Sequence, residues 1–173
     1  MKSLDTYLTV IEKINVWFGK TFSWIALLLM VLTVLEVVLR RFFNSPTIWN
    51  FETCTHLFGL NFMITSAFTL MQDGHVSVDI FRSRLSKKSK ALLDIFCYLI
   101  FFFPFTIVML WKGIDYAQIS WSTRETSWSV FAPPLYPIKT VIPLSFLLLI
   151  LQGVANVTRR VLILNPSKGD FHD

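Results

Sequence analysis

Four stretches of about 20 residues that are almost free of charge dominate this 173-residue chain. They cover residues 21–39, 53–71, 91–111 and 140–158, and only Glu36 and Asp94 place a charge within them. A helix needs about 20 apolar residues to cross ~30 Å of hydrocarbon, whereas a helix in a soluble core usually keeps a polar stripe. With only 16% charged residues, the chain has too little polar sequence to cover four such runs. We therefore predict an all-α integral membrane protein, a four-helix bundle with spans over approximately residues 21–41, 51–71, 91–112 and 139–158.

No internal repeat or low-complexity segment divides the sequence, so residues 1–173 are expected to form a single membrane domain. The first apolar run is not expected to be a cleavable signal. Asp5 and Glu12 lie in the long segment before it, and the residues that follow it are bulky and charged.

The segment before the first span has an apolar stripe of its own. Its members recur at spacings of three and four residues: Leu4, Leu8, Ile11, Asn15 and Phe18. This pattern predicts an amphipathic helix over residues 3–18 that lies in the membrane interface. The alternative is that the helix of the first span simply begins early.

The distribution of Lys and Arg predicts the orientation of the spans. Eleven of these residues lie in the N-terminal segment, the loop between spans two and three, and the C-terminal tail, whereas five lie on the other side. Because short cytoplasmic loops are enriched in positive charge, both termini and the loop that contains residues 72–90 are expected to be cytoplasmic. The net charge of +5 is thus a topology signal and gives no indication of nucleic-acid binding.

Few polar groups lie within the spans. Glu36 falls on the same helical face as Arg40, four residues on, so it is either a proton or ion site or, as we favour, one half of an ion pair. Ser145, Gln152 and Asn156 share one face of the last span, and this face is expected to look inward or toward another protein, because polar side chains in lipid need partners.

The sequence gives no sign of catalytic or cofactor chemistry. We find no nucleophile–base pair, no Gly-rich phosphate loop and no Cys/His metal spacing. His56 is the only histidine within a span, so paired histidine ligation of a haem is not available. The spans also lack the matched, glycine-broken halves that mark a transporter's substrate site. We therefore expect no enzyme activity and no cofactor.

Two polar motifs interrupt the apolar pattern. The first, between spans one and two, contains the turn Asn44-Ser45-Pro46, Trp49 at the outer interface, and Glu52 in the first turn of span two, where a carboxylate favours the helix dipole. The second follows span two and reads DGHVSVD. Asp73 and Gly74 would end the helix, and the alternation of polar and apolar residues after them predicts an extended segment. That segment is either a turn that fixes the helix pair or a contact with another subunit.

The two motifs, at these positions relative to the spans, resemble the small membrane subunit of TRAP (tripartite ATP-independent periplasmic) transporters, the DctQ-like family. The resemblance covers nearly the whole chain in length, number of spans, orientation and order of motifs. Asn50 and Phe51 stand where the family pattern leads us to expect a more polar pair. The residues that match, with Glu36 added as a candidate for subunit interaction, are Glu36, Arg40, Asn44, Ser45, Pro46, Trp49, Glu52, Asp73, Gly74, His75, Val76, Val78 and Asp79.

The resemblance implies a set of partners. A periplasmic substrate-binding protein captures an organic acid, and a large multi-span subunit moves it through the bacterial inner membrane with a sodium gradient. The small subunit is non-catalytic and scaffolds the large one, and the outer loop, residues 112–139, is either anchored by its aromatic residues or helps to dock the binding protein. The rival hypotheses are a stand-alone four-span exporter with Glu36 as its proton site, the small subunit of another tripartite uptake system, and the membrane anchor of a redox complex.

Overall fold

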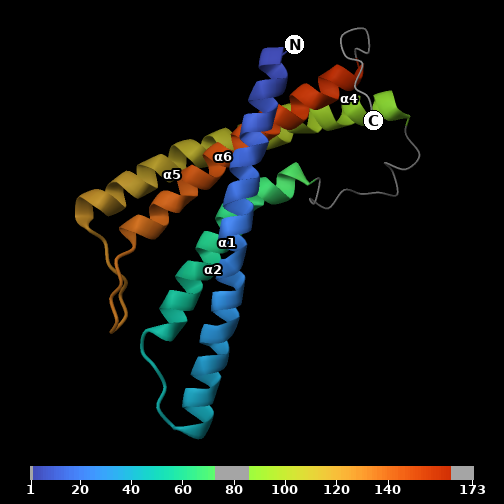
Figure 1. Ribbon diagram of the computed structural model, residues 1–173. Helices are drawn as coiled ribbons and strands as arrows, with labels where there is room; N and C mark the ends of the chain where they lie inside the picture. Colours follow the sequence, from blue (N-terminus) through green and yellow to red (C-terminus); the bar gives the residue numbers. More distant parts are fainter. Residues whose placement is uncertain (1, 73–85, 165–173) are drawn as a thin grey trace.

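The computed structural model describes residues 2–72 and 86–164, with the side chains of residues 2–5, 87 and 163 left aside. Its helices are α1 (Lys2–Phe42), α2 (Asn50–Met71), α4 (Lys87–Cys97), α5 (Phe103–Thr123) and α6 (Tyr136–Leu164), and a short π-helix, η1 (Tyr98–Phe102), joins α4 to α5 (Figure 1). Four helical segments are long and apolar enough to cross a membrane: Thr6–Phe42, Asn50–Met71, Lys88–Thr123 and Tyr136–Leu162. The predicted all-α fold with four membrane helices is confirmed.

The N-terminal segment is the beginning of α1, which runs for 41 residues. The separate interfacial helix predicted over residues 3–18 is not confirmed, because the helix continues through this segment into the first span. The predicted stripe is nevertheless buried: Leu8, Ile11 and Asn15 are 6%, 5% and 1% exposed. They lie against another helix of the same chain, and this packing explains why the segment extends α1 where a free amphipathic helix would turn onto the membrane surface.

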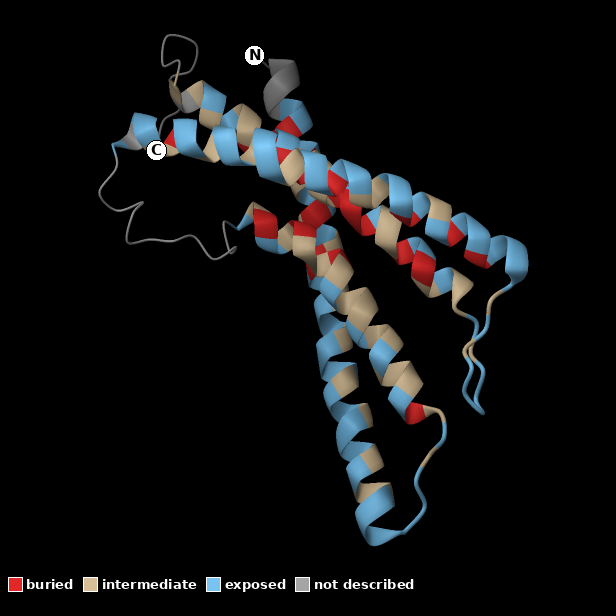
Figure 2. Cartoon of the chain, turned by 180° about the vertical axis from the view of Figure 1, so that it is seen from behind, coloured by how far each residue is buried: buried red, intermediate tan, exposed pale blue. Residues whose placement is uncertain are grey.

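The helices form two antiparallel hairpins, α1 with α2 and α4–α5 with α6 (Figure 1). The hairpins cross near the N-terminal half of α1 and diverge toward the ends that carry the loops 43–49 and 124–135. Buried residues lie at this crossing and along the facing sides of α5 and α6, whereas the outer half of α1 is largely exposed (Figure 2). The apolar cluster of Leu8, Ile11 and Ala155 lies at the crossing, and the divergent part of α1 exposes apolar surface.

Two glycines allow the helices to approach closely at the crossing. A Cβ placed on Gly19 of α1 would lie 2.4 Å from the Phe68 side chain of α2, and one on Gly153 of α6 would lie 2.5 Å from the Phe102 ring. Gly59 differs, since a Cβ there would meet no atom within 4 Å. Gly59 thus faces away from the described parts of the chain.

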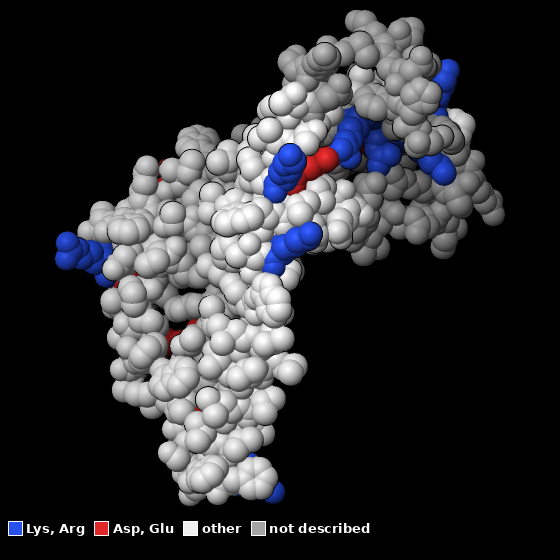
Figure 3. Space-filling model, viewed as in Figure 1, with Lys and Arg blue, Asp and Glu red and all other residues white. Residues whose placement is uncertain are grey.

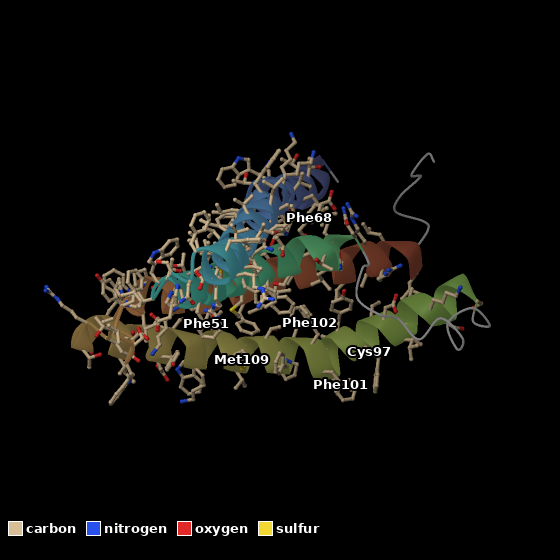
Figure 4. The ribbon with its side chains drawn as sticks, turned by 90° about the horizontal axis from the view of Figure 1, so that it is seen from below. Phe51, Phe68, Cys97, Phe101, Phe102 and Met109 are labelled. Carbon is tan, nitrogen blue, oxygen red and sulfur yellow. The ribbon has the colours of Figure 1, made fainter. Side chains whose placement is uncertain are left out.

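The π-helix ends two residues before Pro104, which lies in the first turn of α5. Proline has no N–H to donate and its ring clashes with the carbonyl four residues earlier. In η1 the N–H of Phe103 instead donates to the carbonyl of Tyr98, five residues earlier. The wider turn places Phe102 toward the other helices, whereas its neighbour Phe101 points outward and is 67% exposed (Figure 4).

Candidate functional site

Glu36 lies near the outer end of α1, and its carboxylate is fully engaged. One oxygen accepts a hydrogen bond from the Arg40 guanidinium at 2.9 Å, and this pair is the one that the spacing predicts. The other oxygen accepts from the backbone N–H of Thr47 at 3.4 Å and from the Thr47 hydroxyl. Glu36 therefore ties the connecting loop back to α1, and each of its carboxylate oxygens already accepts a hydrogen bond.

The turn between α1 and α2 contains the first motif. Asn44 adopts a left-handed backbone conformation with φ of 50°, which asparagine tolerates better than most residues, and the N–H of Ser45 donates to the carbonyl of Leu39 at 3.2 Å. Together with Pro46, these residues reverse the chain without a long loop. Trp49 then occupies the N-cap position of α2.

Asn50 closes the same end of the first hairpin. Its side chain is 5% exposed, and its amide nitrogen donates to the Leu32 carbonyl of α1 at 3.1 Å. Its oxygen accepts from the Cys54 thiol at 3.2 Å. The Asn50 side chain thus links α1 and α2 by itself, because its amide makes one hydrogen bond to each helix.

Glu52 joins the two hairpins at their divergent ends. Its carboxylate accepts hydrogen bonds from the hydroxyls of Ser127 and Ser129, the latter at 2.6 Å, both in the loop between α5 and α6. Sequence analysis assigned Glu52 only to the helix dipole and did not single out either serine. Two hydroxyls 75 and 77 residues away leave no periodic signal in the sequence.

The loop between α5 and α6 is itself held in shape. The N–H of Ser127 donates to the carbonyl of Pro133, and the N–H of Leu135 donates to that of Glu125, both at 2.9 Å. The Glu125 carboxylate pairs with the Lys139 ammonium at 2.5 Å. This hydrogen bond lowers the pKa of Glu125 below its ordinary value.

A second polar cluster lies at the crossing and contains no charge. The Asn15 amide donates to Gln152 at 2.6 Å, Gln152 donates to Asn156 at 2.9 Å, and Asn156 donates to the Tyr98 hydroxyl at 3.0 Å and to the Leu70 carbonyl at 3.2 Å. We call Asn15, Gln152, Asn156 and Tyr98 the amide network. Because its members come from α1, α6 and η1 and it reaches the end of α2, it connects all four spans at one point.

The prediction that the polar face of the last span looks inward is confirmed. Ser145, Gln152 and Asn156 are 1%, 0% and 7% exposed. Asn15 was identified as part of the N-terminal stripe, but its bond to Gln152 was not foreseen. Tyr98 was not singled out at all, because it lies among phenylalanines and other apolar residues that are typical of a membrane span.

Charged pairs surround the inner side of the crossing. Arg159 of α6 pairs with Glu12 of α1, and Arg160 pairs with Asp94 of α4 at 3.2 Å. These pairs hold the N-terminal end of α1 and the start of the third span against α6, beyond the amide network.

The second motif lies outside the described residues. This holds for Asp73, Gly74, His75, Val76, Val78 and Asp79. Their contribution to subunit contact stays a prediction. Among the residues that the structure describes, no group of three His, Cys, Asp or Glu side chains is placed to hold a metal ion.

The geometry is that of a polytopic membrane protein in which the buried amides at the helix crossing bind one another. A model of the DctQ component of tripartite ATP-independent periplasmic transporters matches residues 29–162, more than three quarters of the chain. The chain belongs to this family, as the two motifs predicted. No curated protein matches the chain in sequence.

Proposed function

We propose that this chain is the small, non-catalytic subunit of a sodium-driven TRAP-type uptake system for organic acids, and that it scaffolds the large transporting subunit. The observation that carries the proposal is that the charged and amide groups within the spans bind other groups of the same chain. Glu36 is held by Arg40 and Thr47, and Asn15, Gln152 and Asn156 are joined in the amide network. Three buried oxygens of the described residues keep no hydrogen-bond partner: Asn15 Oδ1, Asn61 Oδ1 and Ser120 Oγ. A carrier needs polar groups free to bind its substrate and coupling ion, and these three neutral oxygens come from three different helices.

The partners follow from the family. A large multi-span membrane subunit would move the substrate, and a periplasmic substrate-binding protein would deliver it, while the lipid bilayer surrounds the rest. The charge asymmetry supports a location in the bacterial inner membrane with both termini cytoplasmic.

The motif residues would act as structural supports in this function. Arg40, through Glu36, and the turn Asn44-Ser45-Pro46 hold the outer end of the first hairpin, and Glu52 holds the second hairpin to it. A rigid outer surface of this kind suits the docking of a binding protein. The DGHVSVD segment would supply a contact to the large subunit on the opposite side.

The alternative is a stand-alone proton-coupled exporter that uses Glu36. This function needs a carboxylate that binds and releases a proton during each cycle. A side chain that holds Arg40 and the Thr47 backbone together is poorly suited to that task, because each protonation would release the loop.

Reconstitution into proteoliposomes distinguishes the two functions. We expect sodium-driven uptake of an organic acid only when this chain, the large subunit and the binding protein are all present. Glu36→Gln should lower the yield of assembled complex and leave the sodium dependence of uptake per complex unchanged. Thr33→Val is the matched control on the same face of α1, since the Thr33 hydroxyl bonds only to its own helix, at the carbonyl of Leu29.

Uptake by this chain alone would overturn the scaffold function. The same conclusion would follow if Glu36→Gln assembled normally yet shifted the sodium dependence, because Glu36 would then belong to the coupling site.

A further inference from the structure

The inner half of α1 carries two lysines that lack an ionic partner among the described residues. Lys13 and Lys20 are both exposed, whereas the nearby Arg159 and Arg160 are paired with Glu12 and Asp94. Figure 3 shows basic side chains spaced along this part of α1, on a face that is otherwise nearly uncharged toward the divergent end. An unpaired charge at a membrane surface attracts a counter-charge from its surroundings.

The two lysines border one groove. Lys13, Trp17 and Lys20 follow one another at spacings of four and three residues and so share a face of the helix. With Thr9, Val16 and Thr21, they line a groove of about 450 Å³. Glu12 also borders the groove, but its carboxylate is engaged by Arg159.

The groove lies at the depth of the lipid headgroups. The apolar run of the first span begins at residue 21, so Lys20 marks the edge of the hydrocarbon, and Lys13 lies about 10 Å farther along the helix at 1.5 Å per residue. Trp17 lies between them with 61% of its surface exposed, and its indole N–H donates no hydrogen bond to the described residues. Tryptophan with an apolar ring and a polar edge is typical of this depth.

We propose that this groove binds the headgroup of an anionic phospholipid. Its phosphate would lie over Trp17, where the ammonium groups of Lys13 and Lys20 reach it from either side and the indole N–H donates to it. The exposed apolar surface of α1 beyond residue 21, including Trp24 and Leu28, receives the acyl chains. The binding site is independent of the transport function proposed above, because it needs only the membrane.

Native mass spectrometry of the full chain tests this site. The protein would be purified in neutral detergent and offered equal amounts of phosphatidylglycerol and phosphatidylcholine with identical acyl chains. We expect the wild type to retain phosphatidylglycerol preferentially, and Lys13→Gln with Lys20→Gln to weaken its binding about tenfold. Trp17→Phe, which removes only the indole N–H donor and the larger ring, should cause a smaller loss.

Lys88→Gln with Lys90→Gln is the matched control, because it removes two lysine charges from the start of α4 on the same side of the molecule. Retention of the two lipids in equal amounts by the wild type would overturn the proposal. So would an equal loss in the control pair, which would show a general charge effect. A large excess of inorganic phosphate should not displace the lipid, and displacement would assign the groove to free phosphate instead.

Discussion

The divergent outer ends of the two hairpins and their crossing are joined by different chemistry. At the outer ends, the carboxylates of Glu36, Glu52 and Glu125 accept hydrogen bonds from hydroxyls of the connecting loops, from the Arg40 guanidinium of α1 and from the Lys139 ammonium of α6. At the crossing, the amide network contains no charge. The difference follows from burial, because the three carboxylates are only partly buried, whereas Asn15, Gln152 and Asn156 are at most 7% exposed among the packed helices.

The cost of burial decides which groups can serve in each place. A charged side chain in the bilayer interior costs several kcal/mol, whereas a side-chain amide both donates and accepts and is therefore satisfied by neutral neighbours of its own kind. A chain of amides also fixes the relative rotation of the helices that carry them. The crossing is thus the rigid joint of the molecule, and the outer ties set how far the arms diverge.

The largest expected effect comes from breaking the amide network. Gln152→Leu removes the acceptor of Asn15 and the donor to Asn156, and it leaves both amides buried without these partners. We expect the free energy of unfolding to fall by about 2–3 kcal/mol. Thr158→Val on the same helix is the control, since Thr158 is exposed and bonds only to the Val154 carbonyl. Reversible unfolding in mixed micelles would measure the stability of both variants. Equal free energies of unfolding would contradict the conclusion that the crossing is the rigid joint.

A smaller loss is expected from crowding the crossing. Gly19→Ala places a methyl group against Phe68 and should destabilise the protein by about 1–2 kcal/mol, the usual range for overpacking. Gly59→Ala is the matched control on α2 and should be neutral or slightly stabilising, because its Cβ meets nothing and alanine favours the helix. The same unfolding measurement compares them, and a Gly19 variant as stable as the Gly59 variant would mean that α1 and α2 are not in contact there.

The outer tie between the hairpins should affect local motion more than global stability. Glu52→Ala frees Ser127 and Ser129, so we expect amide hydrogen exchange over residues 125–135 to accelerate several-fold while exchange at the crossing stays unchanged. Ser127→Ala with Ser129→Ala should reproduce the effect, and adding Glu52→Ala to that pair should change little. Accelerated exchange at both ends would show that the two regions are not independent.

The smallest expected effect is the response of the outer loop to acid. The hydrogen bond from Lys139 lowers the pKa of Glu125, so the folded loop favours the ionised carboxylate. This contribution is complete above the ordinary glutamate pKa and is lost as pH falls from there through the lowered value. Hydrogen exchange of residues 125–135, corrected for the intrinsic rate, should therefore increase over that window in the wild type. Glu125→Gln should show a smaller step, because protonation of Glu52 also weakens its bonds to Ser127 and Ser129 in this loop. A step of equal size in both proteins would assign the response to Glu52 or another group.

The spans and their polar faces were predictable from the sequence because they depend on local periodicity. Charge-free runs located all four membrane helices, and the spacing of Glu36 and Arg40 predicted their ion pair. The shared face of Gln152 and Asn156 predicted that these amides have partners, and left open whether the partners lie in this chain or in another protein. The break between an interfacial helix and the first span was not confirmed, since the stripe that suggested a membrane surface packs against α6 at Ala155 and Leu151 instead. An apolar stripe indicates that one face of a helix is covered, but it does not indicate whether lipid or another helix covers it.

The long-range partners were not predictable because no period links them. The bonds from Asn15 to Gln152 and from Ser127 to Glu52 join residues 137 and 75 positions apart. Their existence depends on the angle at which the two hairpins cross. The close approaches of Gly19 to Phe68 and of Gly153 to Phe102, each within one hairpin, were likewise not predictable, because a lone glycine in an apolar run does not indicate which side chain packs on it.

The π-helix in the third span limits how that part of the sequence can evolve. Its hydrogen bond to the fifth preceding residue amounts to one inserted residue, and one residue corresponds to a rotation of about 100° about the helix axis. Deletion of a single residue from Tyr98–Phe102 would restore α-helical bonding but would turn α4 against α5 and carry Asp94 away from Arg160. Substitutions can therefore accumulate along both halves of this helix, while the number of residues between Asp94 and Pro104 must stay the same.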